Sequence, residues 1–369
     1  MCRLVQRRGI IGLFCLLFVA SSVVPGWAQK DNRFEVSKNL DIFNSLLKEV
    51  EMFYVDSVDV DKTVQRGIEA MLAGLDPYTE YYPEQKTEEL SLMTTGEYGG
   101  IGSLIRQRNN EGGVMIAEPT EGMPADLAGL KPGDLILAID TIDVSKATNS
   151  RVSELLKGVP NTKMVLTIQR PGEKKPRKFE ITRKQITTPQ VTYYGVKNDS
   201  IGYIYLKAFT IKSAQEVKEA FLDLKKNHNI KSLVLDLRGN GGGVLEGAVQ
   251  IVGMFVPKGS EVLSTKGKIK QWDRTYRTST EPLDTVMPLA ILINGGTASA
   301  AEIVSGSLQD MDRAVLVGQR SFGKGLVQAP RDLPYNGKVK ITMSKYYIPS
   351  GRCIQQIDYS HRKEDGSVA

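Results

Sequence analysis

The chain has 369 residues, of which 41% are hydrophobic and 24% are charged, a composition typical of soluble globular proteins. This length exceeds that of one ordinary hydrophobic core, so we expect two or three domains. The formal net charge of +6 falls to +3 without the three arginines near the N-terminus, and the remaining charges are spread along the chain. This distribution argues against a basic nucleic-acid-binding face.

Residues 1–28 have the pattern of an export signal. Three arginines within the first eight residues precede an almost unbroken apolar run over 10–24, and Gly-Trp-Ala at 26–28 suits cleavage by a signal peptidase. The apolar run is shorter than the ~20 residues that span a bilayer. We therefore expect a cleaved signal peptide and an exported protein of the periplasm or cell envelope, with an uncleaved membrane anchor as the alternative.

The cysteines and histidines restrict the chemistry that is open to the chain. Cys2 and Cys15 belong to the expected leader, so the mature chain has one thiol, Cys353, which we interpret as structural. The two histidines, His228 and His361, lie in polar, charged stretches, so a Ser-His-Asp triad and a histidine zinc site are poorly supported. No HExxH or phosphate-loop motif is present, and we predict neither a metal ion nor a cofactor.

Residues 34–90 are predicted to form a short N-terminal helical segment. Apolar residues recur at helical spacing over 42–54 and again over 64–72. Pro77 ends the second helix, because proline disfavours helical geometry at the residue before it. The exit from this helix, LDPYTEYY at 75–82, is acidic and rich in tyrosine. We expect a small helical element rather than a complete domain.

Residues 91–187 change to short strands separated by glycine-rich turns, with a helix expected over 149–156 and a final strand over 164–169. The order of a glycine-rich loop, a strand, a short helix, GLKPGDLILAID, a second helix and a final strand resembles a PDZ domain. In PDZ domains the loop before the second strand binds a peptide C-terminus through backbone N–H groups, and glycines permit this close approach. The peptide then adds as an extra strand.

The PDZ resemblance implies a peptide-binding groove between this loop, the strand that follows it and the second helix. The residues expected to form it are Tyr98, Gly99, Gly100, Ile101, Gly102, Leu104, Val152 and Leu155. Arg170, near the end of the final strand, is expected to couple the PDZ domain to the remainder of the protein. The alternative is a PDZ-like fold that serves only as a structural spacer.

Beyond about residue 190, apolar strands alternate with helices. The expected strands are 201–206, 232–237, 289–293 and 314–317, and the expected helices are 214–226, 245–255 and 300–308. This alternation predicts an α/β core with a largely parallel sheet over 190–358. A charged tail, 359–369, follows it.

Three segments of this core have residues suited to catalysis. The first, NGGTASAAE at 294–302, places Ser299 among small residues at a helix N-terminus, where free N–H groups and the helix dipole favour a developing anion. An ordinary helix cap is the competing interpretation. The second, SFGKGLVQ, places Lys324 between two glycines. A lysine acts as a base only when neutral, so burial has to lower its pKa; phosphate binding is the alternative.

The third segment, DLRGNGGG at 236–243, ends a strand. Such a turn presents backbone N–H groups that suit an oxyanion. A nucleotide-binding loop is the competing interpretation, but the segment has neither the Walker spacing nor the dinucleotide-binding spacing.

Together, DLRGNGGG, NGGTASAAEI and GQRSFGKGLVQ resemble the C-terminal processing peptidases (tail-specific proteases, peptidase family S41), which have a ClpP/crotonase-like α/β protease core and an inserted PDZ domain. The resemblance extends from about residue 35 to 355. It implies that Ser299 attacks the scissile carbonyl while Lys324 removes its proton. It also implies that Gln328 orients the lysine amine, and that the backbone N–H groups of Ala300 and Gly242 hold the oxyanion.

The resemblance further implies an exported serine endopeptidase that binds C-terminal tails of unfolded or tail-exposed protein substrates, with a homo-oligomer and an adaptor protein as further partners. No nucleic acid and no tightly bound small molecule are expected. Many relatives have serine where this chain has Ala301, and relatives usually continue beyond the position of Ala369, so the sequence leaves open whether this chain is a truncated form. The alternatives are a noncatalytic PDZ adaptor with a vestigial protease core and a crotonase-like acyl-CoA enzyme.

Overall fold

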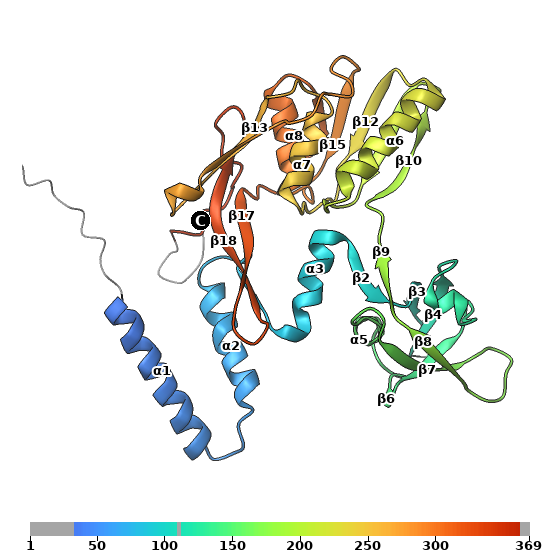
Figure 1. Ribbon diagram of the computed structural model, residues 1–369, viewed down its shortest axis with the longest axis vertical. Helices are drawn as coiled ribbons and strands as arrows, with labels where there is room; N and C mark the ends of the chain where they lie inside the picture. Colours follow the sequence, from blue (N-terminus) through green and yellow to red (C-terminus); the bar gives the residue numbers. More distant parts are fainter. Residues whose placement is uncertain (1–32, 109–111, 362–369) are drawn as a thin grey trace, which may run out of the picture. The chain divides into compact units, whose positions relative to one another are not determined.

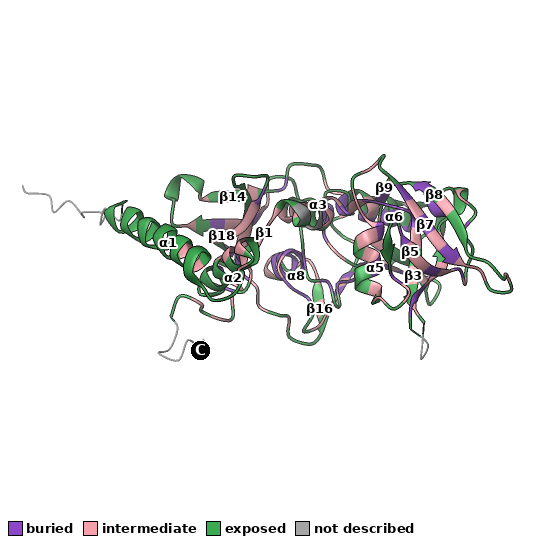
Figure 2. Cartoon of the chain, turned by 90° about the horizontal axis from the view of Figure 1, so that it is seen from below, coloured by how far each residue is buried: buried purple, intermediate pink, exposed green. Residues whose placement is uncertain are grey.

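The computed structural model describes residues 33–108 and 112–361, so the expected signal peptide and most of the charged tail lie outside the described residues. The chain divides into two units, 1–66 and 67–369. Helix α1 (Arg33–Phe53) has no buried residue, and Figure 2 shows it exposed along most of its length. Helix α2 (Val60–Ala73) ends before Pro77, as the sequence predicts.

The segment after α2 contributes to a sheet that the sequence analysis did not predict. It contains β1 (Glu80–Tyr82), the 3-10 helix η1 (Glu84–Lys86) and α3 (Thr87–Thr95). Strand β1 pairs antiparallel with β18 (Lys338–Tyr347), near the other end of the chain. The tyrosine-rich exit from the helices is therefore bound to the C-terminal part of the protein.

The middle of the chain forms an antiparallel domain. Strand β2 (Glu97–Gly100) pairs with β9 (Lys184–Thr187), and a six-stranded sheet has the order β3-β4-β5-β7-β8 with β6 beside β5. Its elements are β3 (Ser103–Gln107), β4 (Val114–Pro119), α4 (Pro124–Leu127), β5 (Leu135–Ile139), β6 (Ile142–Asp143), α5 (Asn149–Leu156), β7 (Lys163–Gln169) and β8 (Arg177–Thr182). Helix α5 has the predicted bounds.

The predicted α/β core is confirmed. Its sheet has the order β10-β11-β12-β15-β16, in which β10 is antiparallel to β11 and the other pairs are parallel. The strands are β10 (Val191–Lys197), β11 (Ile201–Leu206), β12 (Ser232–Asp236), β15 (Leu289–Ile293) and β16 (Val315–Gly318). The helices are α6 (Ser213–His228), α7 (Leu245–Gly253) and α8 (Ala300–Asp310).

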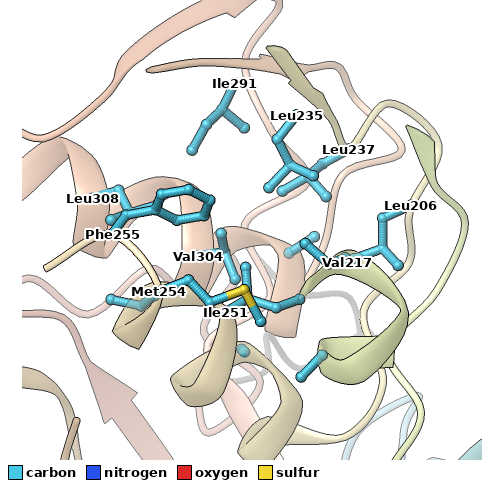
Figure 3. Packing of buried hydrophobic residues seen from close by; sticks show 14 of the residues in the cluster. Leu206, Val217, Leu235, Leu237, Ile251, Met254, Phe255, Ile291, Val304 and Leu308 are labelled. Carbon is cyan, nitrogen blue, oxygen red and sulfur yellow. The ribbon is translucent and has the colours of Figure 1, made fainter. Parts of the chain in front are cut away.

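Helices α6, α7 and α8 cover one face of this sheet (Figure 1). Figure 3 shows the core that results, in which Leu235 and Ile291 of the sheet meet Val217, Ile251 and Val304 of the three helices. Each of these side chains is fully buried, and burial of one such side chain stabilises the fold by about 1.5–3 kcal/mol. The core thereby holds in place the loops that follow β12 and β15, at the edge where ligands of parallel sheets usually bind.

A second, antiparallel sheet contains β17 (Leu326–Asp332), the strand that follows the lysine loop. Strand β18 pairs with β1, with β13 (Glu261–Gly267) and with β17, and β13 also pairs with β14 (Arg274–Arg277). The 3-10 helix η2 (Lys270–Trp272) connects β13 to β14. Within 33–108 and 112–361, no helix combines the length and hydrophobicity that crossing a membrane requires.

Candidate active site

The serine loop and the glycine turn form one hydrogen-bonded unit. The Asn294 side-chain oxygen, directly after β15, accepts the N–H groups of Gly239 at 2.9 Å and Gly296 at 3.0 Å. The N–H group of Ala298 donates to the carbonyl of Asn240 at 2.9 Å. The segments 236–243 and 294–299, which the sequence analysis considered separately, are therefore adjacent.

Ser299 has an unusual backbone conformation at the N-cap of α8. Its φ is 54° and its ψ is −118°, a region that residues with a Cβ atom rarely adopt. Strain of this kind costs about 1–3 kcal/mol and is found mainly at functional sites.

We expect the Ser299→Gly variant to be more stable than Ser299→Ala by about 1 kcal/mol. Glycine adopts positive φ without steric cost, and this gain exceeds the entropy that glycine adds to the unfolded chain. The free energy of unfolding, measured in denaturant for both variants, tests the expectation. If alanine gives the more stable protein, the backbone at position 299 is not strained.

Gly242 lies directly against the serine. A Cβ atom at Gly242, whose φ is +93°, would lie 2.7 Å from Ser299 Cβ and 2.9 Å from the Ala300 nitrogen, so only glycine fits. Within the described residues, the Ala300 N–H group has no acceptor, whereas the Gly242 N–H group donates to Asn240 Oδ1 at 2.9 Å. Of the two expected oxyanion donors, the Ala300 N–H is therefore open to a substrate oxygen, whereas the Gly242 N–H is already hydrogen-bonded to Asn240 in its own turn.

Glu302 links the serine to the lysine loop. Its carboxylate is 1% exposed, and Oε2 accepts both the Ser299 N–H and the Lys324 N–H, each at 2.9 Å. The other oxygen, Oε1, accepts the Gly323 N–H at 2.7 Å. The sequence analysis missed Glu302, although the spacing Ser-x-x-Glu at a helix start is a capping-box signal.

Tyr346 of β18 makes a second link between the same two residues. Its side chain is 1% exposed, and its hydroxyl donates to the Lys324 carbonyl and contacts the Ser299 carbonyl at 3.2 Å. Burial raises the pKa of the Tyr346 hydroxyl well above its usual value, so it remains a donor. No local sequence pattern distinguishes this tyrosine from its neighbours.

The Lys324 side chain is partly buried. Burial lowers the pKa of its amine below the usual value, and the positive charge of Lys340 acts in the same direction. Its Nζ lies 4.2 Å from the centroid of the Tyr78 ring. Within the described part of the chain, the hydrogen bonds of Lys324 are made by its backbone.

Gln328 lies on β17, beyond the lysine. Its amide Nε2 donates to Thr342 Oγ1 at 3.0 Å, rather than contacting the lysine amine as the sequence analysis expected. Its side-chain oxygen has no hydrogen-bond donor among residues 33–108 and 112–361. The structure therefore brings Ser299 and Lys324 together through their backbones and directs Gln328 toward β18.

Asp236 and Arg238 hold the strand end that precedes the glycine turn. The Arg238 guanidinium binds the Asp236 carboxylate at 2.6 Å, and the Tyr203 hydroxyl donates to the same carboxylate at 2.6 Å. Burial alone would raise the pKa of Asp236, but the hydrogen bonds from Arg238 and Tyr203 hold it below its usual value. A fixed negative charge thus orients this arginine.

The other titratable candidates are not hydrogen-bonded to the serine within the described residues. His228 ends α6 and is 3.8 Å from Asp223, while His361 is 2.7 Å from Asp358. Cys353 is a half-buried free thiol. No histidine among the described residues contacts Ser299 or Lys324.

The elements expected to border the peptide groove, β3 and α5, are connected by Gln107, whose side-chain oxygen accepts the Asn149 N–H at 2.7 Å. The predicted groove residues differ in exposure. Leu104 is 57% exposed and Leu155 is half-buried, whereas Val152 is fully buried in the core of the domain. The prediction that Val152 faces the groove is therefore corrected, because this face of α5 packs against the sheet.

The segment 98–102, expected to be a loop, is mostly strand, because Tyr98, Gly99 and Gly100 belong to β2 and pair with β9. Ile101 and the glycines are buried, and a Cβ atom at Gly99 would lie only 1.8 Å from the Gly158 carbonyl oxygen. Gly100 and Gly102 have similarly crowded surroundings. The ring of Tyr98 is half-buried and has the Lys157 amine 5.4 Å from its centroid.

Arg170 has partners only inside its own domain, within the described part of the chain. Its guanidinium makes two 2.8 Å hydrogen bonds to the Asp134 carboxylate and one of 2.9 Å to the Gly129 carbonyl. The Asp134 carboxylate is fully buried. The expectation that Arg170 couples this domain to the protease core is not supported, because the buried carboxylate satisfies its charge locally.

The chain is similar to known proteins. The model of peptidase family S41 matches residues 200–360, and a PDZ domain model matches residues 115–170. A carboxy-terminal-processing protease of Bartonella bacilliformis is 36% identical over 356 residues, which cover 95% of this chain and 81% of that protein. A probable CtpA-like serine protease of Staphylococcus aureus is 33% identical over 320 residues. This match covers 86% of this chain but only 62% of the length of the Staphylococcus protein.

Solved structures are also similar. The photosystem II D1 C-terminal processing protease is 29% identical, with 85% of this chain and 89% of that chain matched and a TM-score of 0.47. The peptide-bound PDZ domain of a carboxy-terminal protease from Vibrio cholerae is 26% identical and matches 25% of this chain and 99% of that chain, with a TM-score of 0.23. The identity and coverage of the Bartonella relative show that the chain belongs to peptidase family S41, as a PDZ-containing serine protease of the carboxy-terminal-processing type.

Proposed function

We propose that the chain is an exported serine endopeptidase in which Ser299 is the nucleophile and Lys324 is the general base. The observation that carries this proposal is the shared oxygen of Glu302, which accepts the N–H groups of both residues at 2.9 Å. The lowered pKa of the lysine amine further supports it, because a base has to be neutral to accept a proton. The leader predicted at 1–28 is the basis for export.

In the proposed reaction, Lys324 Nζ takes the proton of the Ser299 hydroxyl as the serine oxygen forms a bond to the scissile carbonyl carbon. The carbonyl oxygen becomes negative and accepts the free Ala300 N–H group at the start of α8, together with an N–H group of the 241–243 turn. When the intermediate collapses, the C–N bond breaks and Lys324 returns the proton to the leaving amine. Water activated by the same amine then hydrolyses the acyl-enzyme.

Two side chains have to move for this reaction. The Lys324 amine has to leave the Tyr78 ring and approach the serine hydroxyl, and the Gln328 side-chain oxygen has to accept a hydrogen bond from that amine. The Gln328 oxygen is free of other donors within the described residues, which supports this role. For Gly242 to serve as the second oxyanion donor, its N–H group has to leave Asn240.

The PDZ domain is proposed to bind the C-terminal tails of unfolded substrates between β3 and α5. The exposed Leu104 and the half-buried Leu155 supply apolar contacts there, and Ile101 and Gly102, between β2 and β3, supply backbone N–H groups for the terminal carboxylate. A homo-oligomer and an adaptor that delivers substrates are further proposed partners.

The test is incubation of the purified protein with a permanently unfolded polypeptide that has an apolar free C-terminus. We expect fragments from this substrate. Amidation of its C-terminus should lower kcat/KM by at least about tenfold, because the carboxylate contact is lost. A substrate with a charged C-terminal residue reports on the groove's preference. Tail binding without any cleavage would instead identify a noncatalytic adaptor, and cleavage that ignores the tail would remove the PDZ role.

A further inference from the structure

A tyrosine from the segment that follows the N-terminal helices packs against the Lys324 amine. The Tyr78 ring lies 4.2 Å from Lys324 Nζ, measured to the ring centroid, which is well within the range of a cation–π interaction. The two residues are separated by most of the chain. The segment LDPYTEYY therefore reaches the candidate base directly.

The ring of Tyr78 is held by a tight turn. The Asp76 carboxylate, 7% exposed, accepts the Tyr78 N–H at 2.8 Å and the Thr79 N–H at 2.9 Å, and its second oxygen accepts the Thr79 hydroxyl at 3.0 Å. Tyr359 packs edge-on against the Tyr78 ring at 5.9 Å, with the two hydroxyls 3.5 Å apart. We call residues 76–79 the lead-in turn.

The lead-in turn also contacts Thr342, whose hydroxyl binds the Gln328 side chain. The Thr79 hydroxyl oxygen lies 3.3 Å from Thr342 Oγ1, and it accepts the Thr342 N–H at 3.2 Å. Thr342 Oγ1 is the same atom that accepts the Gln328 amide at 3.0 Å. One turn is thus connected to the lysine through Tyr78 and to the glutamine through Thr79.

We propose that the lead-in turn is a positioning element of the active site, in which the Tyr78 ring holds the Lys324 amine in its resting place. The inference rests on the proposed function above, since it assigns the turn a role toward the base of that reaction. Thr79 holds Gln328 in the same resting arrangement through Thr342. Release of both side chains from this turn then accompanies alignment of the base with the serine.

Neighbouring charges and the Tyr78 ring together set the pKa of the Lys324 amine. Lys340 of β18 opposes a proton on Lys324, while Glu80 of β1, Asp76 of the lead-in turn and Glu302 of α8 favour one. The negative face of an aromatic ring also favours the ammonium form, by an amount that corresponds to about 0.5–1 unit of pKa. Replacing the ring by an apolar chain therefore lowers the pKa of the amine.

The test compares Tyr78→Met with Tyr78→Phe, both in Ser299→Ala protein so that no self-cleavage occurs. Methionine fills the space without a π face, and phenylalanine retains the ring but loses the hydroxyl. The rate at which an amine-reactive ester labels Lys324, followed by peptide mass spectrometry across pH, reports the pKa. We expect the parent value for Tyr78→Phe and a value lower by about 0.5–1 unit for Tyr78→Met.

The outcomes separate this inference from the proposed function. Equal pKa values for the two variants, or a higher value for Tyr78→Met, would overturn it, and a purely structural role would lower the Tm without separating the pKa values. With Ser299 restored, the acidic limb of kcat/KM should shift to lower pH in Tyr78→Met alone. A labelling difference in a protein that cleaves no substrate would refute the proposed function and leave the Tyr78–Lys324 interaction standing.

Discussion

Replacing Ser299 with alanine, or Lys324 with methionine, is expected to lower kcat/KM for an unfolded substrate by at least ~10⁴-fold. Each change removes one member of a pair that acts as a unit, so the double variant should be no less active than either single one. Methionine suits position 324 because it has a similar length and no proton to exchange. Fragment formation followed by gel and mass spectrometry measures the loss.

Two controls separate lost chemistry from lost structure. Both variants should bind a tail peptide with unchanged Kd, since the groove between β3 and α5 lies in a different domain from the serine. Lys324→Met should also have a Tm at least as high as the parent, because it removes a partly buried ammonium group whose burial lowers its pKa. Cleavage that persists in Ser299→Ala at the parental rate would place the nucleophile elsewhere.

Replacing Glu302 with glutamine should lower kcat by about 10²-fold and the free energy of unfolding by about 1–3 kcal/mol. The buried carboxylate accepts three backbone N–H groups, from Ser299, Gly323 and Lys324. A glutamine amide presents its own N–H₂ group to at least one of these donors, whichever way it is oriented. The serine and lysine backbones then separate, and the proton transfer between them slows.

A matched control is Glu246→Gln, in the first turn of α7. It also removes a negative charge from a helix N-terminus, but its side chain is exposed. We expect nearly parental kcat from Glu246→Gln and a loss confined to kcat, with KM little changed, from Glu302→Gln. Equal kcat values for the two variants would show that Glu302 contributes only through the helix dipole.

Local sequence signals were sufficient to predict the bounds of individual helices and strands. The bounds of α5, β11 and β15 agree with prediction, because hydrophobic periodicity and flanking turn residues operate within a few positions of the chain. The alternation of strands and helices likewise predicted the parallel sheet. Ser299 and Lys324 were proposed because their segments, together with DLRGNGGG, resemble the motifs of a known family, whereas their small and glycine neighbours alone left other interpretations open.

Contacts between distant segments were decided by the tertiary structure alone. The second sheet joins β1 to β18, and no local pattern indicates such a pairing. Tyr346, Tyr78 and the second contact of Glu302 depend on which segments that sheet and α8 bring together. Val152 was predicted to face the groove, Arg170 to couple the domains and Gln328 to orient the lysine amine. The observed contacts of all three differ, because they too depend on segments far apart in the chain.

The sequence by itself therefore determined the α/β core and the PDZ-like domain, because short-range periodicity and turn residues encode them, while the proposal for Ser299 and Lys324 rests on the family resemblance of three motifs. Only the tertiary structure decided how the serine and the lysine are joined. A shared buried carboxylate and a tyrosine hydroxyl make that link, and such hydrogen bonds between segments far apart in the chain depend on the complete packing of the fold.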